Sequence, residues 1–154
     1  MSTKNKTRNS TFILSQCAVL ILAIFLPSLA GCKKDNPLTA KEQVTKMLTS
    51  AEAWQSPVVT IDGVDYSDLY KDFTIKFNDA TYISSGGAPV WAAGGTWVLI
   101  NEEATLMKLD GKRDVEILVT DEFLELSFLW QENTFEPGRV NSVKGKQKFK
   151  LKKK

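Results

Sequence analysis

Apolar and polar residues alternate along most of the chain beyond residue 54. One polar side chain separates each of Phe73, Ile75 and Phe77 from the next, and one also separates Phe149 from Leu151. Because successive side chains of a strand point to opposite faces, this alternation predicts strands with one buried face and one wet face. Eight such segments follow one another: residues 57–61, 73–79, 81–84, 96–100, 105–109, 115–120, 123–130 and 145–152.

One segment before the strands has a helical period instead. Val44, Met47 and Leu48 recur at the spacing of one helix face. Thr39 and Glu42 have the spacing of a capping box, in which each side chain accepts a hydrogen bond from the backbone of the other residue. The pattern predicts an amphipathic helix of about ten residues that packs on the sheet, with binding of a partner as the alternative role.

Short links predict how the strands are connected. Turn-forming residues occupy positions 78–80, 101–103, 110–111 and 121–122, and links this short join antiparallel neighbours. A meander of this kind either closes or leaves an exposed edge strand. We therefore expect an all-β fold, an eight-stranded up-and-down β-barrel with a short N-terminal helix. An immunoglobulin-like sandwich is the alternative, but it needs longer crossing connections than the middle of this chain provides.

The N-terminal region has the pattern of a secretory signal. Residues 1–11 are polar and positively charged, and residues 12–30 are mostly apolar. Small residues then lead to a cysteine in Leu29-Ala30-Gly31-Cys32. We predict that residues 1–31 are a signal peptide. The alternative is an uncleaved anchor, which polar residues and Pro27 disfavour because they interrupt the apolar run.

The end of this signal resembles the lipobox of bacterial lipoproteins. The resemblance implies cleavage between Gly31 and Cys32, lipidation of Cys32, and a mature protein that is tethered to a membrane without spanning it. Residues 32–38 then comprise the lipidated cysteine and a polar tether. The Lys and Asp residues after Cys32 resemble the export signals of surface lipoproteins in Bacteroidetes. This implies a place in the bacterial cell envelope, at either face of the outer membrane.

Cleavage changes the charge of the protein. The chain of 154 residues has 20 basic and 18 acidic residues. Because the signal contains three basic and no acidic residues, the mature chain keeps 17 basic against 18 acidic residues, a net charge of −1. Its length allows one modest hydrophobic core, which we assign to a single barrel domain at residues 39–154.

The barrel segment resembles the lipocalin-like lipoproteins of Bacteroidetes. A short helix precedes Trp54, Gly95-Thr96-Trp97 lies midway, and a Gly-x-x-x-Phe-x-Leu pattern begins at Gly145. The resemblance covers about residues 39–152 and implies a lipocalin-like barrel. It further implies that Trp54 closes one end of the barrel beneath a basic side chain. Arg139 is the candidate for this structural cation–π contact.

The sequence offers little catalytic chemistry. It contains no His, and its two Cys residues are Cys17, in the signal, and Cys32, so the folded domain has no thiol. The neighbouring carboxylates Glu102-Glu103 and Asp121-Glu122 fall at expected turns, where solvation explains them better than a glycosidase pair. The aspartates of residues 62–72 lack the spacing of an EF-hand calcium loop. We predict no enzyme activity, no metal and no cofactor.

Seven lysines between residues 144 and 154 form a basic stripe. They alternate with core residues and lack both interleaved arginine and exposed aromatic residues. We therefore expect a solvated strand face that protects a sheet edge, and no binding of nucleic acid.

Aromatic residues near glycine-rich loops, Trp91 among them, are the remaining candidates for function. An eight-stranded barrel is just wide enough to be filled by side chains or to hold one small ligand. We expect a lipoprotein that binds a small apolar ligand; the alternative is a structural or protein-interaction lipoprotein with a filled barrel and an unknown partner. The predicted ligand-lining residues are Phe77, Tyr82, Trp97, Phe128 and Trp130.

Overall fold

The computed structural model describes residues 37–132 and 143–154. Within these residues, the helix α2 (Ala40–Thr49) is followed by nine strands and a 3-10 helix, η1 (Ser67–Tyr70). The strands are β1 (Trp54–Ile61), β2 (Val64–Asp65), β3 (Thr74–Phe77), β4 (Thr81–Ser85), β5 (Gly94–Leu99), β6 (Leu106–Leu109), β7 (Arg113–Val119), β8 (Phe123–Trp130) and β9 (Gly145–Lys153). Eight of them correspond to the eight predicted segments, with ends that differ by a few residues.

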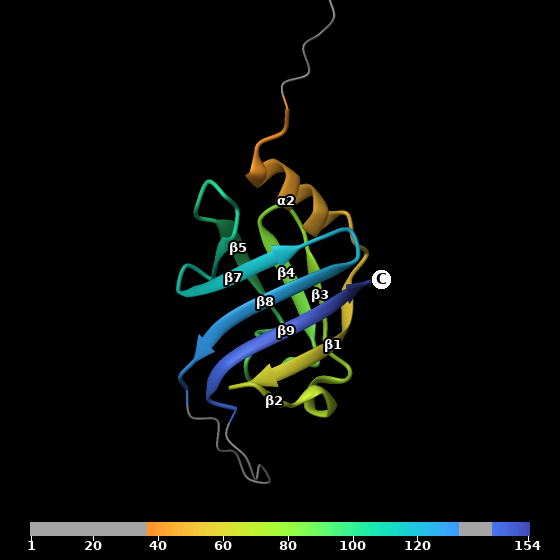
Figure 1. The fold of residues 1–154 in the computed structure, drawn as a ribbon, viewed down its shortest axis with the longest axis vertical. Helices are drawn as coiled ribbons and strands as arrows, with labels where there is room; N and C mark the ends of the chain where they lie inside the picture. The colour runs from red at the N-terminus through yellow and green to blue at the C-terminus, as the bar shows by residue number, and fades with distance from the viewer. Residues whose placement is uncertain (1–36, 133–142) are drawn as a thin grey trace, which may run out of the picture. The chain divides into compact units, whose positions relative to one another are not determined.

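Eight strands close into an antiparallel barrel (Figure 1). From β3 to β9 each strand pairs with the next along the chain, β3 pairs with β1, and β9 returns to pair with β1. The closing ladder places Val59 opposite Phe149 and Ile61 opposite Gln147. The two-residue β2 adds only a short antiparallel pairing to the end of β1. The expectation of a closed eight-stranded β-barrel is therefore confirmed, and the β1–β9 ladder excludes the sandwich.

The alternation of the last strand explains the closure. Gln147, Phe149 and Leu151 are completely buried, whereas the lysines between them are exposed. One face of β9 lies inside the barrel and the other faces solvent. This placement buries the apolar side chains and leaves the lysines in water. Because β9 pairs with β8 on one side and β1 on the other, its lysines do not protect a sheet edge. That part of the expectation was wrong, since closure removes the edge.

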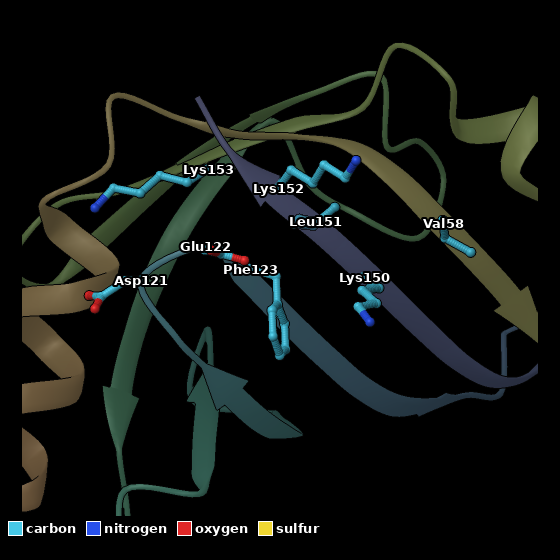
Figure 2. Close-up of a pocket in the computed structure, with 8 residues that line it drawn as sticks. All are labelled: Val58, Asp121, Glu122, Phe123, Lys150, Leu151, Lys152 and Lys153. Atoms are coloured by element: carbon cyan, nitrogen blue, oxygen red, sulfur yellow. The ribbon is translucent and has the colours of Figure 1, made fainter.

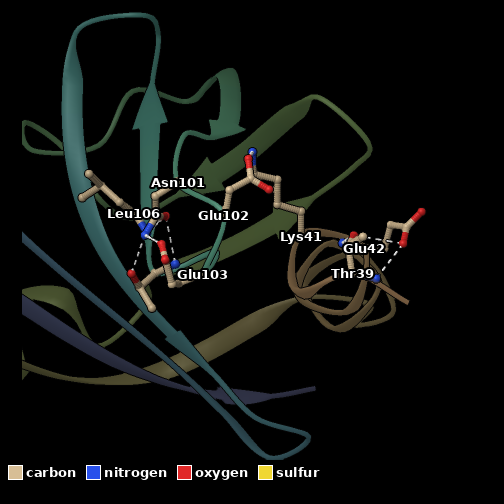
Figure 3. A network of polar contacts seen from close by, with 8 residues as sticks. Thr39, Lys41, Glu42, Asn101, Glu102, Glu103 and Leu106 are labelled. Carbon is tan, nitrogen blue, oxygen red and sulfur yellow. Dashed lines mark hydrogen bonds and ion pairs between the residues drawn. The ribbon is translucent and has the colours of Figure 1, made fainter. Parts of the chain in front are cut away.

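The capping box of α2 is confirmed (Figure 3). The Glu42 N–H donates to Thr39 Oγ1 at 3.3 Å, and the Thr39 N–H donates to Glu42 Oε2 at 2.8 Å. Leu48 is completely buried, and the Trp54 indole N–H donates to its carbonyl oxygen at 3.2 Å. The helix thus packs over one end of the barrel, which we call the helix end.

The opposite end, called here the loop end, carries the connections at residues 62–73, 86–93 and 110–112. Two of these connections are more ordered than expected. The first contains β2 and η1, and it buries Tyr70. The second buries Val90 and Trp91. Apolar side chains from these loops therefore contribute to the core, together with the strands.

Candidate functional site

Aromatic rings gather inside the barrel. All five predicted ligand-lining residues are buried, with no more than 5% of the surface of any of them exposed. The centroid of the Phe77 ring lies 5.6 Å from that of Trp97 and 6.4 Å from that of Tyr82. The Trp97 indole N–H donates to the Asn78 carbonyl at 2.8 Å, at the turn between β3 and β4. Three of the predicted residues thus form one cluster on β3, β4 and β5.

Trp91 joins this cluster to the rest of the interior. It comes from the connection between β4 and β5, and its ring centroid lies 6.2 Å from that of Tyr82. The Phe128 and Phe149 rings lie 5.4 and 5.6 Å from Trp91, both nearly perpendicular to it. Aromatic rings prefer such edge-to-face contacts. A side chain from a loop therefore occupies the centre of the aromatic core.

Arg113 faces inward at the loop end. It begins β7, where it shares the inward parity of the buried Val115 and Ile117. The guanidinium carbon lies 4.5 Å from the centroid of the Trp130 ring and 5.1 Å from that of Phe128, so the cation is stacked on both aromatic faces. Arg113 was not among the site residues predicted from the sequence. The alternation of residues 113, 115 and 117 was the signal that could have found it.

The surroundings of Arg113 limit its pairing. Its Nη1 donates to the Val90 carbonyl at 2.8 Å, and no carboxylate in the described residues forms an ion pair with it. Burial lowers the pKa of Arg113, while Tyr82, Glu132 and Asp110 act in the opposite direction. The guanidinium group stays charged at neutral pH, as arginine does in proteins. The loop end thus holds a half-buried cation without an anionic contact partner among the described residues.

Three buried polar atoms of residues that contact Arg113 or adjoin its ring partner Phe128 have no hydrogen-bond partner in the described residues. They are the indole nitrogens of Trp91 and Trp130 and the Oε1 atom of Gln147. The Nε2 atom of Gln147 does donate, to the Val143 carbonyl at 2.5 Å. Gln147 also lies opposite Phe128 in the β8–β9 ladder. We call Arg113, Trp91, Trp130 and Gln147 the loop-end polar cluster. A buried polar atom left unpaired costs roughly 1–3 kcal/mol.

A pocket of about 530 Å³ lies at the surface of the loop end. Arg113 and Trp130 line it together with the turn between β6 and β7 and the end of β8. Asp110 and Glu132 line its rim and are exposed. The cation and one of its aromatic partners are therefore accessible from outside the barrel.

A second pocket lies on the outer face of the barrel (Figure 2). It is lined by Val58, by the predicted carboxylates Asp121 and Glu122, and by Phe123 and Lys150 to Lys153. The ammonium of Lys150 lies 4.8 Å from the centroid of the Phe123 ring. Asp121 and Glu122 occupy the turn before β8, as expected, and both are exposed.

Several of the other acidic residues considered from the sequence have structural contacts. Glu102 forms an ion pair with Lys41 of α2 at 2.8 Å (Figure 3), and Glu103 accepts from Asn101 Nδ2 at 3.1 Å. Asp62 accepts from the Lys146 N–H at 2.8 Å and so links β1 to β9. In residues 37–132 and 143–154 no group of three potential metal-ligating side chains comes together.

Trp54 is completely buried at the helix end. Within the described part of the chain, cation–π contacts involve Arg113 and Lys150, and none involves Trp54. Arg139, its predicted partner, lies outside the described residues. Gly31 and Cys32 also lie outside them. Lipidation and closure of the barrel by Trp54 therefore stay predictions.

No model of a known protein family matches this chain, and no curated protein matches it either. In the described residues, no helix combines the length and the apolar character needed to cross a membrane. The apolar segment at residues 12–30 lies outside them.

Proposed function

We propose that the protein is a lipid-anchored lipoprotein of the bacterial cell envelope whose lipocalin-like barrel binds a small ligand with an apolar body and catalyses no reaction. Two features support the barrel part of this proposal: the ladders follow the order of the chain, and α2 packs over one end. The lipobox resemblance at Leu29-Ala30-Gly31-Cys32 supports the anchor.

One observation carries the choice of a binding function. The pocket at the loop end reaches the inward aromatic Trp130, which contacts the stacked Arg113. Pockets for small molecules typically combine apolar walls with a few polar groups that fix the orientation of the ligand. The loop end offers this combination, whereas α2 packs over the other end.

The rival function is that of a structural or protein-interaction lipoprotein with a filled barrel. The central position of Trp91 favours it, because this ring contacts Phe73, Tyr82, Phe128 and Phe149 at once. A ligand that enters the centre of the barrel must displace Trp91 or bind above it. The two functions therefore differ in whether the ring packing opens.

Native mass spectrometry separates the two functions. The protein is purified from its own membranes and incubated with a lipid and metabolite extract of its host. A carrier shows a stoichiometric adduct that Trp97→Ala or Phe128→Ala weakens, while Phe123→Ala, at the half-buried outer ring, leaves the adduct unchanged. A bare mass under all conditions contradicts ligand binding and favours the filled barrel.

Metabolic labelling tests the anchor. Cells that express the full chain take up a labelled palmitate analogue, and the label is expected on the wild-type protein and on the Cys17→Ala variant. The Cys32→Ala variant is expected to carry none. Equal labelling of both cysteine variants would contradict lipidation at Cys32.

A further inference from the structure

We infer that the ligand of the barrel carries a carboxylate, which Arg113 and the indole N–H groups of the loop-end polar cluster bind while the aromatic rings hold its apolar body. This inference rests on the proposed function, because it names the chemical class of the ligand that the proposed site would take.

Arg113 has hydrogen-bond donors that no acceptor in the described residues uses. A guanidinium has five N–H donors in one plane, which match the two oxygens of a carboxylate. Among the described residues, Arg113 has one hydrogen-bond acceptor, the Val90 carbonyl. The Trp130 and Phe128 rings contact the guanidinium through their aromatic faces and offer it no acceptor oxygen. The inward cation is therefore held in place by its packing and has donors left for a bound anion.

Most of the unpaired polar atoms in the loop-end polar cluster are donors. The Trp91 and Trp130 indole nitrogens are donors only, and both residues are at least 95% buried. Together with Arg113 they form a donor-rich cluster, so a bound group needs acceptor oxygens. Gln147 Oε1 is the one orphan acceptor in this cluster. It suits a ligand hydroxyl or a water molecule beside the carboxylate.

The charged residues around Arg113 limit the negative charge that a ligand can carry at this site. The same pocket is lined by three acidic residues, Asp110, Asp114 and Glu132, and by one basic residue besides Arg113, Lys112. The Asp110 carboxylate accepts from the Tyr82 hydroxyl at 2.9 Å and from the Thr96 N–H at 2.8 Å, which keeps it at the rim. Because three acidic residues outnumber the two cations, the lining repels a second negative charge on a ligand. The site thus favours a monoanion such as a carboxylate over a phosphate monoester.

Three probes with the same alkyl chain test this inference: decanoic acid, methyl decanoate and decyl phosphate. The full chain in a non-ionic detergent is titrated with each probe and followed by native mass spectrometry. We expect the acid to bind about tenfold or more tightly than the ester, as hydrogen bonds to a charged group imply. Decyl phosphate is expected to bind more weakly than the acid.

Variants then assign the preference to one residue. Arg113→Met should remove the preference for the acid over the ester, because the charged contact with the carboxylate is lost. Arg113→Lys should keep a reduced preference, since an ammonium lacks the planar fork. The matched control, Lys152→Met, removes an exposed positive charge on β9 and should change nothing.

Each outcome is decisive. Acid and ester that bind equally well to the wild type would overturn the carboxylate inference and leave the carrier function standing. Binding of none of the three probes would overturn the inference, and the extract experiment above would then decide the carrier function. Near-ultraviolet circular dichroism checks that each variant is folded. If Arg113→Met does not fold, the wild-type preference and the Arg113→Lys variant decide the question.

Discussion

Tyr82 and Asp110 form a polar pair that joins β4 to the turn between β6 and β7. The Tyr82 hydroxyl donates to one oxygen of Asp110, and the Thr96 N–H donates to the other. Gly95 lies directly beneath the pair, and a Cβ atom at this position would overlap the Asp110 carboxylate. The glycine is thus required by a close approach of side chains, independent of its own backbone angles.

The pair sets the ionisation of Tyr82. Burial first, and then the hydrogen bond to Asp110, raise the pKa of Tyr82 to about 12. Since the folded pKa lies above the ordinary value of 10.0, this group stabilises the fold below pH 10, and its contribution is lost as the pH rises towards 12. Absorbance titration of tyrosinate should therefore show a component near pH 12 that is missing in Tyr82→Phe.

The Asp110→Asn variant separates the two causes. It should lower the pKa of Tyr82 without returning it to the ordinary value, because burial is the larger cause and stays. The Asp114→Asn variant removes a nearby exposed carboxylate outside the pair and serves as the control. A Tyr82 that titrates at its ordinary pKa in the wild type would contradict the buried pair.

At the scale of single elements, the capping box should govern the stability of α2. The Thr39→Ala variant removes the side-chain acceptor of the Glu42 N–H and should cost about 1 kcal/mol in the free energy of unfolding. Thr39→Ser keeps the acceptor and is the matched control. Urea unfolding measures the difference. Hydrogen exchange should show faster exchange at the first turn of the helix in the alanine variant alone.

A result in which Thr39→Ala and Thr39→Ser have the same stability would contradict this role. It would mean that packing of Leu48 and Trp54, both completely buried, holds the helix without help from its cap. Tertiary packing of an apolar face is the main source of stability for short helices, so the two contributions must be compared by measurement.

The elements that were predicted correctly have strong local signals. The strict alternation around Phe149 gave β9, and the Thr39–Glu42 spacing gave the start of α2. The 3-10 helix η1 was not predicted. The burial of its residue Tyr70 depends on the Phe149 ring, whose centroid lies 5.0 Å from that of Tyr70. Contacts between residues this far apart in the chain leave no local periodicity to read.

The same limit applies to the candidate site. The inward aromatics were predicted because alternation fixes the face of each strand residue. The position of Trp91 depends on how a loop folds back, and the stacking of Arg113 depends on the register of β7 and β8. Which polar atoms are left without partners, such as Gln147 Oε1, follows only from the complete three-dimensional packing.

At the scale of the whole molecule, β9 closes the barrel by pairing with both β8 and β1. It pairs with β8 along its whole length and with β1, the first strand. It also buries Gln147, Phe149 and Leu151 completely. A chain that ends at residue 144 therefore exposes two strand edges and opens the core. We expect this truncation to abolish cooperative unfolding and to expose apolar surface that binds a hydrophobic dye.

The truncation has a control and a rescue, which make it a test of closure. A chain that ends at Leu151 loses only the exposed lysines 152–154 and should unfold cooperatively. A synthetic peptide of residues 145–153, added to the shorter chain, should insert as a strand and restore the near-ultraviolet circular dichroism, since an open sheet edge accepts an added strand. Cooperative unfolding of the chain that ends at residue 144 would show that the barrel does not depend on the β1–β9 ladder. A peptide with Phe149→Lys should fail to rescue, because the same backbone pairing would then place a charge among the rings of Tyr70, Phe73 and Trp91.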